Sequence, residues 1–239
     1  MCGTQTEEDT QGFMNICENG CGDKIRNRWQ RSIDKMGALF VNYKFDTFRV
    51  NQDNNTAYKA CVKFSNNPII DENKPSAICL SSSNPGVGKT HLGVSVVRQW
   101  LITTKPEVKY PLEPRNVAWC ITSDTRILQD VRKTYNDDHY EDEDDVISRY
   151  GRYPILMIDD LGKYKPEKLY FTQRVLYEII NLRYIKRLPT VFTTNLIGNS
   201  LQDYLSDYTY DRILGMARFV DSKGEILHPI YDIKGESHR

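Results

Sequence analysis

The chain lacks a long hydrophobic run, a net charge and a signal peptide, and each absence excludes a class of protein. No apolar run is long enough to cross a membrane as a helix, so we expect no membrane-embedded segment. The residues from Met1 to Asp9 contain neither a basic nor an apolar region, so we expect a cytoplasmic protein. The 32 basic residues balance the 32 acidic ones, so any contact with nucleic acid must come from local patches.

A complete set of zinc ligands is also missing. Cys17 and Cys21 have a C-x-x-x-C spacing, and Cys2 offers a third thiolate. A structural zinc site needs a fourth ligand, and no histidine lies nearby in the sequence. The alternative to a metal site is a set of reduced cysteines in a loose N-terminal segment.

The first 42 residues differ in pattern from the rest of the chain. Up to about Gly22 they are polar and without clear periodicity, which is typical of a partly disordered segment. From Lys24 to Phe40 apolar residues recur every three or four positions, which predicts an amphipathic helix with Trp29 and Ile33 on its apolar side. Another face carries a basic stripe, which either faces solvent or contacts a phosphate backbone or an acidic partner.

What the sequence does contain is a glycine-rich loop between a predicted strand at 77–80 and a helical pattern at 91–100. The loop reads S-N-P-G-V-G-K-T and departs from the phosphate-loop pattern G-x-x-x-x-G-K-[ST] only at Ser83. Glycines let backbone amides turn toward a phosphate, Lys89 would reach the β- and γ-phosphates, and the Thr90 hydroxyl would ligate Mg²⁺. The alternative is a glycine-rich turn before an ordinary helix. The residues predicted to contact nucleotide are Asn84, Pro85, Gly86, Val87, Gly88, Lys89, Thr90 and His91.

Two acids follow another apolar run, at 155–158. Asp159 would hold Mg²⁺ directly or through water, and Asp160 would orient or deprotonate the attacking water. Taken alone, the pair is better explained as two solvated acids at the end of a strand. Together with the glycine-rich loop at a fitting distance, it predicts ATP as the ligand and Mg²⁺ as its ion.

Predicted strands alternate with predicted helices along the rest of the chain, which indicates an α/β fold with a five-stranded parallel sheet covered by helices on both faces. Ser123 or Asp124 can cap a helix that begins there. The acidic run 141–145 is either a solvated loop or the first turn of a helix. The remaining strands are expected at 116–122, 190–193 and 230–233, and a long helix at about 172–186.

Two further polar residues fit a nucleotide site. Asn195 follows the fourth strand, so it would lie at the ligand crevice and sense the γ-phosphate or hold the water, unless it only forms a turn. Arg212 lies well beyond that strand and could reach the γ-phosphate of a neighbouring subunit. A surface salt bridge is the competing explanation for Arg212, and Arg218 is a rival for the same role.

The order of these motifs resembles the AAA+ ATPases of the bacterial and phage DnaC/DnaI helicase-loader group, with the transposition ATPase IstB as a relative. The resemblance covers about Tyr43 to Arg239, and the combination is specific although each motif alone is not. The matching stretches are Y-K-F-D-T-F at 43–48, P-G-V-G-K-T-H-L at 85–92, I-D-D-L-G at 158–162, T-T-N-L at 193–196, D-R-I at 211–213 and G-E-S-H-R at 235–239.

The resemblance implies a role for each matching residue and a P-loop NTPase (AAA+) domain at 43–239. It implies slow hydrolysis, stimulated by DNA or a partner, because Asp160 stands where the family often has glutamate. The implied roles are Walker A for Lys89 and Thr90, Walker B for Asp159 and Asp160, sensor 1 for Asn195, arginine finger for Arg212 and sensor 2 for Arg239.

The resemblance also implies partners. A loader would bind a replicative DNA helicase and single-stranded DNA, would self-associate through Arg212, and would release the helicase on hydrolysis. Residues 1–42 would be the helicase-docking element, because family loaders carry their helicase-binding domain there, unless the helix at 24–40 packs on the core of its own chain. The residues that would contact DNA are Arg126, Arg132 and Lys133, with Tyr164 and Tyr170 as possible stacking residues.

Three alternatives remain open from the sequence. The chain could be an IstB-like transposition helper that acts on duplex DNA, or an adaptor that binds nucleotide without significant hydrolysis. A small-molecule P-loop kinase is the third, but it would need an arginine-rich lid, and the sequence contains no such segment.

Overall fold

The computed structural model describes residues 40–66, 75–104, 119–136, 141–164, 166, 168–220, 226–227 and 230–234. The chain divides into two compact units, Met1–Asn42 and Tyr43–Arg239, and every helix and strand described belongs to the second. The helix expected before Phe40 and the thiols Cys2, Cys17 and Cys21 lie outside the described residues. Among the helices that are described, none has the length and apolar character to cross a membrane.

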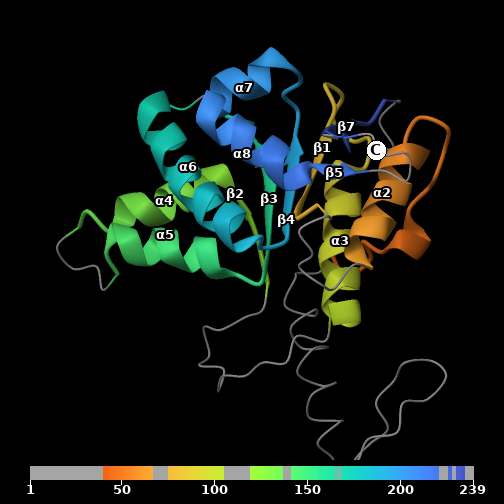
Figure 1. Cartoon of the computed structure of the whole chain (residues 1–239), viewed down its shortest axis with the longest axis horizontal. Helices are drawn as coiled ribbons and strands as arrows, with labels where there is room; N and C mark the ends of the chain where they lie inside the picture. The colour runs from red at the N-terminus through yellow and green to blue at the C-terminus, as the bar shows by residue number, and fades with distance from the viewer. Residues whose placement is uncertain are drawn as a thin grey trace, which may run out of the picture. The chain divides into compact units, whose positions relative to one another are not determined.

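A five-stranded sheet forms the centre of the second unit, and every pair of neighbouring strands in it is parallel (Figure 1). In two of its strands, β1 (Ala77–Ser81) and β4 (Thr190–Thr194), every residue is buried. The strand order is β2-β3-β4-β1-β7, where β2 is Trp119–Ser123, β3 is Ile155–Leu161 and β7 is Ile230–Asp232. This confirms the five-stranded parallel sheet that the alternating pattern predicts.

Helices cover both faces of the sheet, as buried parallel strands require (Figure 1). On one face lie α2 (Asn55–Ser65) and α3 (Lys89–Thr104), and α3 packs directly on β1, β3 and β4. The other face is covered by α4 (Asp124–Lys133), α5 (Glu143–Arg152), α6 (Leu169–Lys186), α7 (Asn199–Leu205) and α8 (Asp207–Ala217). The short elements are the 3-10 helix η1 (Phe45–Thr47) and the antiparallel pair β5 (Phe219–Val220) and β6 (Ile226–Leu227).

Three elements differ from the expectation. Strand β3 does not end before the two acids but continues through them, with a register shift against β4 between Ile158 and Leu161. Helix α6 begins at Leu169, earlier than expected. Helix α2 was not predicted, although Ala57, Cys61 and Phe64 form a buried stripe at helical spacing along it.

Local capping explains where two helices begin. The Ser123 hydroxyl accepts a hydrogen bond from the backbone N–H of Arg126 at 3.2 Å, so Ser123 rather than Asp124 caps α4. Asp142 and Asp145 form a reciprocal capping box at the start of α5. The acidic run is therefore the start of a helix, where negative charge is favourable.

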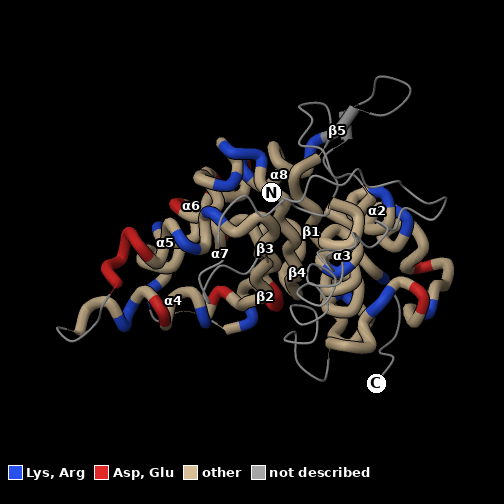
Figure 2. Tube along the Cα trace, turned by 90° about the horizontal axis from the view of Figure 1, so that it is seen from below, with Lys and Arg blue, Asp and Glu red and all other residues tan. Residues whose placement is uncertain are grey.

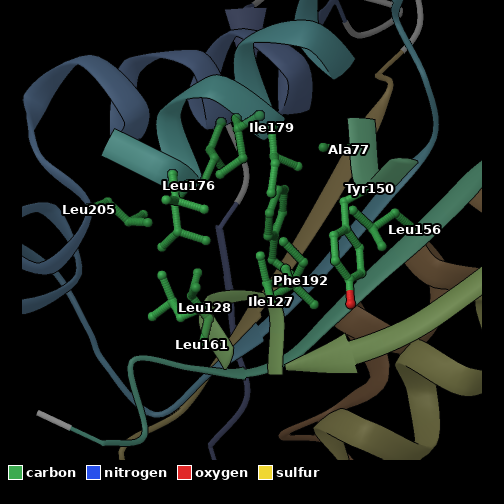
Figure 3. Close-up of a cluster of buried hydrophobic side chains, with 14 of the residues drawn as sticks. Ala77, Ile127, Leu128, Tyr150, Leu156, Leu161, Leu176, Ile179, Phe192 and Leu205 are labelled. Atoms are coloured by element: carbon green, nitrogen blue, oxygen red, sulfur yellow. The ribbon is translucent and has the colours of Figure 1, made fainter. Parts of the chain in front are cut away.

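The alternation of side chains along the strands decides which residues reach the helices on each face. Ile158 and Phe192 belong to the hydrophobic cluster under α4 to α8 (Figure 3). Met157 and Thr193 face α3 instead, because a Cβ placed on Gly93 of α3 would lie 2.5 Å from the Met157 Cε and 3.4 Å from the Thr193 Cγ2. The two-residue period continues this face to Asp159, at the end where α3 begins.

Candidate functional site

The carboxyl ends of four parallel strands meet at one edge of the sheet. Ser81 of β1 lies opposite both Thr194 of β4 and Asp232 of β7, and Thr194 lies opposite Leu161 of β3. The Thr194 hydroxyl donates to the Leu161 carbonyl at 2.7 Å and ties two of these ends together. Ligands of open α/β sheets bind at this edge, so the functional site is expected here.

The glycine-rich loop leaves β1 at this edge and leads into α3. Gly86 and Gly88 have φ angles of 79° and 97°, a region that favours glycine. A Cβ at Gly88 would also lie 2.6 Å from the Phe48 Cε2, so this position has no room for a side chain. Ser83 is not among the described residues with positive φ. Serine therefore fits where the usual pattern has glycine, and the departure strains nothing.

Lys89 lies inside this loop with only 6% of its surface exposed. Its ammonium donates to the carbonyls of Ser82 and Asn84 at 3.3 and 3.0 Å. Burial lowers the pKa of Lys89, while the nearby charges of Asp160, Asp159 and Asp232 oppose that shift. The sequence carries no signal that Asp232 belongs to this group, because only the register of β7 against β1 brings it near Lys89.

The side chains of Thr90, Asp159 and Thr193 form one hydrogen-bonded group. The Thr90 hydroxyl donates to Asp159 Oδ1 at 3.0 Å, and the Thr193 hydroxyl donates to the same oxygen at 2.6 Å. Burial raises the pKa of Asp159, and the two hydroxyl hydrogen bonds oppose that rise. The facing hydroxyl and carboxylate of Thr90 and Asp159 offer the oxygen ligands that Mg²⁺ prefers, so these residues fit the predicted ion.

Asp160 is held from two sides. Its backbone N–H donates to the Thr193 hydroxyl at 2.9 Å, and its φ of 54° is unusual for a residue other than glycine. Its carboxylate Oδ2 lies 2.7 Å from the ammonium of Lys163. Thr193 therefore links both acids of the motif. In the sequence, Thr193 is recognisable only as part of a strand end, and Lys163 carries no signal of this contact.

Asn195 directly follows β4 at the same edge of the sheet. Its Oδ1 atom is buried and has no hydrogen-bond partner among the described residues. Buried polar atoms in proteins nearly always have a partner, so this acceptor is available to a water or a bound group. Its role as a γ-phosphate sensor stays a prediction.

An aromatic cluster lies against the start of α3. The rings of Tyr43 and His91 stack with their centroids 4.6 Å apart, and Phe48 meets His91 edge to face. His91 Nε2 also lies 2.8 Å from the carbonyl oxygen of Lys44. The segment that carries part of the family resemblance is thereby packed against the glycine-rich loop, next to Gly88.

The structure does not join Arg212 to this group. Arg212 lies on α8, donates from Nε to the Asn181 side chain at 3.1 Å, and its guanidinium lies 4.7 Å from the centre of the Tyr184 ring. Arg218 is exposed at the end of the same helix. Arg239 lies outside the described residues.

The residues expected to contact DNA are exposed but mostly paired. Arg126 and Lys133 on α4 lie 3.3 and 3.2 Å from Asp130, and Figure 2 shows basic and acidic residues mixed along this helix. Arg132 packs over the ring of Phe171. Tyr164 and Tyr170 are 63% and 80% exposed, so both rings are accessible for stacking.

No protein-family model matches the chain. The chain is similar to the replicative helicase loader DnaC of Buchnera aphidicola subsp. Baizongia pistaciae (strain Bp), with 22% identity over 188 residues that cover 78% of this chain and 70% of that protein.

Solved structures of a DnaC loader and of a DnaA initiator have a similar fold. A crystal structure of the DnaC helicase loader superposes with a TM-score of 0.62 at 18% identity, over 83% of this chain and all of that one. The replication initiator DnaA bound to AMPPCP and single-stranded DNA superposes with a TM-score of 0.55 at 18% identity, over 74% of this chain and 48% of that one. The chain therefore shares the fold of these DnaC and DnaA structures, and its similarity to a DnaC loader agrees with the resemblance to the DnaC/DnaI group.

Proposed function

We propose that this chain is an ATP-dependent DNA replication protein that loads a replicative helicase. The single observation that carries the proposal is the group formed by Lys89, Thr90 and Asp159 at the carboxyl edge of the sheet. The similarity to a DnaC loader over 78% of the chain supports the same role. In this proposal ATP holds the protein in its loading conformation, and hydrolysis releases it.

Each residue of the group has a proposed task. Lys89 binds the β- and γ-phosphates, while Thr90 and Asp159 hold Mg²⁺. The ion, when bound, neutralises phosphate charge. Asp160 orients the attacking water or takes its proton, and the unpartnered Oδ1 of Asn195 binds that water or the γ-phosphate.

Self-association completes the proposed site. Arg212 contacts Asn181, Asp211 and Tyr184 and none of the loop residues, and we propose that it leaves these contacts to act on a neighbouring copy. An arginine supplied in this way stabilises the charge that develops during phosphoryl transfer. Arg239 is proposed as a second contact to the nucleotide. We propose slow hydrolysis that DNA or the helicase stimulates.

Single-stranded DNA is the second proposed partner. Tyr164 and Tyr170 are exposed side chains on which bases could stack, and the Lys163 ammonium lies 5.8 Å from the centre of the Tyr164 ring. A DnaA structure with single-stranded DNA has the same fold, which supports a nucleic-acid partner. Arg126, Arg132 and Lys133 would add phosphate contacts, and salt would weaken them.

A pull-down with a hexameric replicative helicase tests the proposal. The full chain with ATP and single-stranded DNA should retain the helicase, and omission of ATP should release it. Trp29→Ala should weaken retention if the first 42 residues dock the helicase, while Lys35→Ala on the basic face serves as the matched control. Retention of a transposase but no helicase would favour the IstB-like alternative and contradict the loader.

A nucleotide-binding adaptor without significant hydrolysis is the second candidate. The ion pair between Lys163 and Asp160 favours it, because the acid proposed to act on water is already engaged. Steady-state phosphate release from the native chain and from Lys89→Met separates the two. Equal rates for both would favour the adaptor over the ATPase.

A further inference from the structure

A tight turn fixes the relation between Asp160 and Lys163. The Lys163 backbone N–H donates to the Asp160 carbonyl at 3.0 Å, and Gly162 between them has a φ of 75°. A Cβ on Gly162 would also meet the Leu196 side chain, so the position favours glycine. The Gly162 N–H is also held by the buried carboxylate of Asp124 at 2.7 Å. The turn is therefore anchored on both sides.

This turn brings the Lys163 ammonium back onto the Asp160 carboxylate, with 2.7 Å between Nζ and Oδ2. An ammonium at this distance occupies one carboxylate oxygen, so that oxygen is not free to hold a water molecule. Thr193 holds the Asp160 backbone independently of the ion pair. Opening of the pair would therefore free the side chain without moving the strand.

We propose that Lys163 is a positioning residue that holds the Asp160 carboxylate away from the attacking water and so keeps hydrolysis slow. The inference rests on the proposed ATPase function and gives a physical reason for its low rate. The side chains of Lys163 and Asp160 are 48% and 32% exposed, so solvent weakens their attraction. The restraint is therefore small and reversible, and its loss should raise the rate about 2- to 5-fold.

The test compares kcat and KM for ATP in the native chain, Lys163→Gln and Lys163→Arg. Lys163→Gln should raise kcat about 2- to 5-fold and leave KM unchanged. Lys163→Arg keeps a cation at the same place and should return kcat to the native value. Lys186→Gln, at an exposed lysine at the end of α6, is the matched control and should behave as the native chain does.

Two results would overturn the inference. If kcat of Lys163→Gln equals the native value, Lys163 exerts no restraint; if it falls, Lys163 supports Asp160 instead. An equilibrium titration with ATP separates this failure from failure of the proposed function. A native chain that binds and hydrolyses ATP while Lys163→Gln shows no rise refutes the inference alone, whereas a native chain that binds no ATP refutes both.

Discussion

A nearly buried cation lies at the carboxyl ends of the central strands and another at their amino ends, and the two form very different hydrogen bonds. Lys89 lies at the carboxyl edge, and Arg183 of α6 lies at the amino edge beside the starts of β3 and β4. Arg183 donates to the Thr190 hydroxyl and to three carbonyl oxygens, of Tyr150, Tyr153 and Pro189. Within the part of the chain that the structure describes, Lys89 donates to two carbonyls of its own loop, those of Ser82 and Asn84.

The different hydrogen bonds of the two cations indicate that Arg183 stabilises the fold, whereas Lys89 fits a ligand-binding role. The acceptors of Arg183 belong to two separate segments of the fold, 150–153 and 189–190, and burial lowers the pKa of Arg183 to about 9, so it stays charged at neutral pH. Lys89 has a donor remaining, and three acids lie close enough for their charges to act on it. A buried cation whose acceptors belong to separate elements joins those elements, whereas a buried cation that keeps a donor for another group can bind an anionic ligand.

The largest effect on stability is expected at the amino edge. Arg183→Met keeps the bulk of the side chain but leaves the carbonyls of Tyr150 and Tyr153 without their donor. We expect the free energy of unfolding to fall on the order of 3 kcal/mol, because buried acceptors lose their partners. Denaturant unfolding measures it, and Arg152→Met at an exposed site on α5 is the control. Equal losses for the two variants would contradict a structural role for Arg183.

A smaller effect is expected from Thr193→Val at the carboxyl edge. The hydroxyl that donates to Asp159 and accepts from the Asp160 N–H is lost. We expect about 1 kcal/mol less stability and roughly tenfold slower ATP hydrolysis, since both acids lose a shared anchor. Thr193→Ser keeps the hydroxyl and should retain most of the activity. Thr193→Val with the same turnover as Thr193→Ser would show that this bridge is not needed.

The smallest effect on stability is expected from Lys89→Met. Burial lowers the folded-state pKa of Lys89 below its unfolded value, so the charged form is disfavoured in the fold. This loss of folding stability is present below the folded-state pKa of Lys89 and disappears as the pH rises through that pKa. At pH 7 it therefore lowers the stability of the native chain. Unfolding in denaturant should give a free energy within about 0.5 kcal/mol of native, or higher. A large loss would make Lys89 a structural cation like Arg183.

The sequence predicts those parts of the site that are local in the chain. Lys89 and Thr90 lie in one loop, and Asp159 follows an apolar strand, so spacing alone indicates their shared edge. The parallel sheet was predictable for the same reason, because helices and strands alternate. Strand β3 was predicted too short, because a register shift lets it continue past the acids.

Residues that depend on tertiary contacts were missed. Asp232 reaches Lys89 only through the register of β7, and Lys163 meets Asp160 only because Gly162 turns the chain. Arg183 has the spacing of an ordinary helical surface residue and gives no sign in the sequence that it is fully buried. The group that Arg212 is expected to contact belongs to another copy of the chain, and Arg239 itself lies outside the described residues, so the roles of both stay predictions.

Equilibrium binding of ATP in the presence of Mg²⁺, compared between the native chain and Lys89→Met, tests the central claim most directly. The claim is that the carboxyl edge of the sheet is the nucleotide site. The native chain should bind one ATP per chain, and Lys89→Met should bind about 10- to 100-fold more weakly because a charge-assisted contact to phosphate is lost. Equal affinity for ATP in the two proteins would contradict the claim.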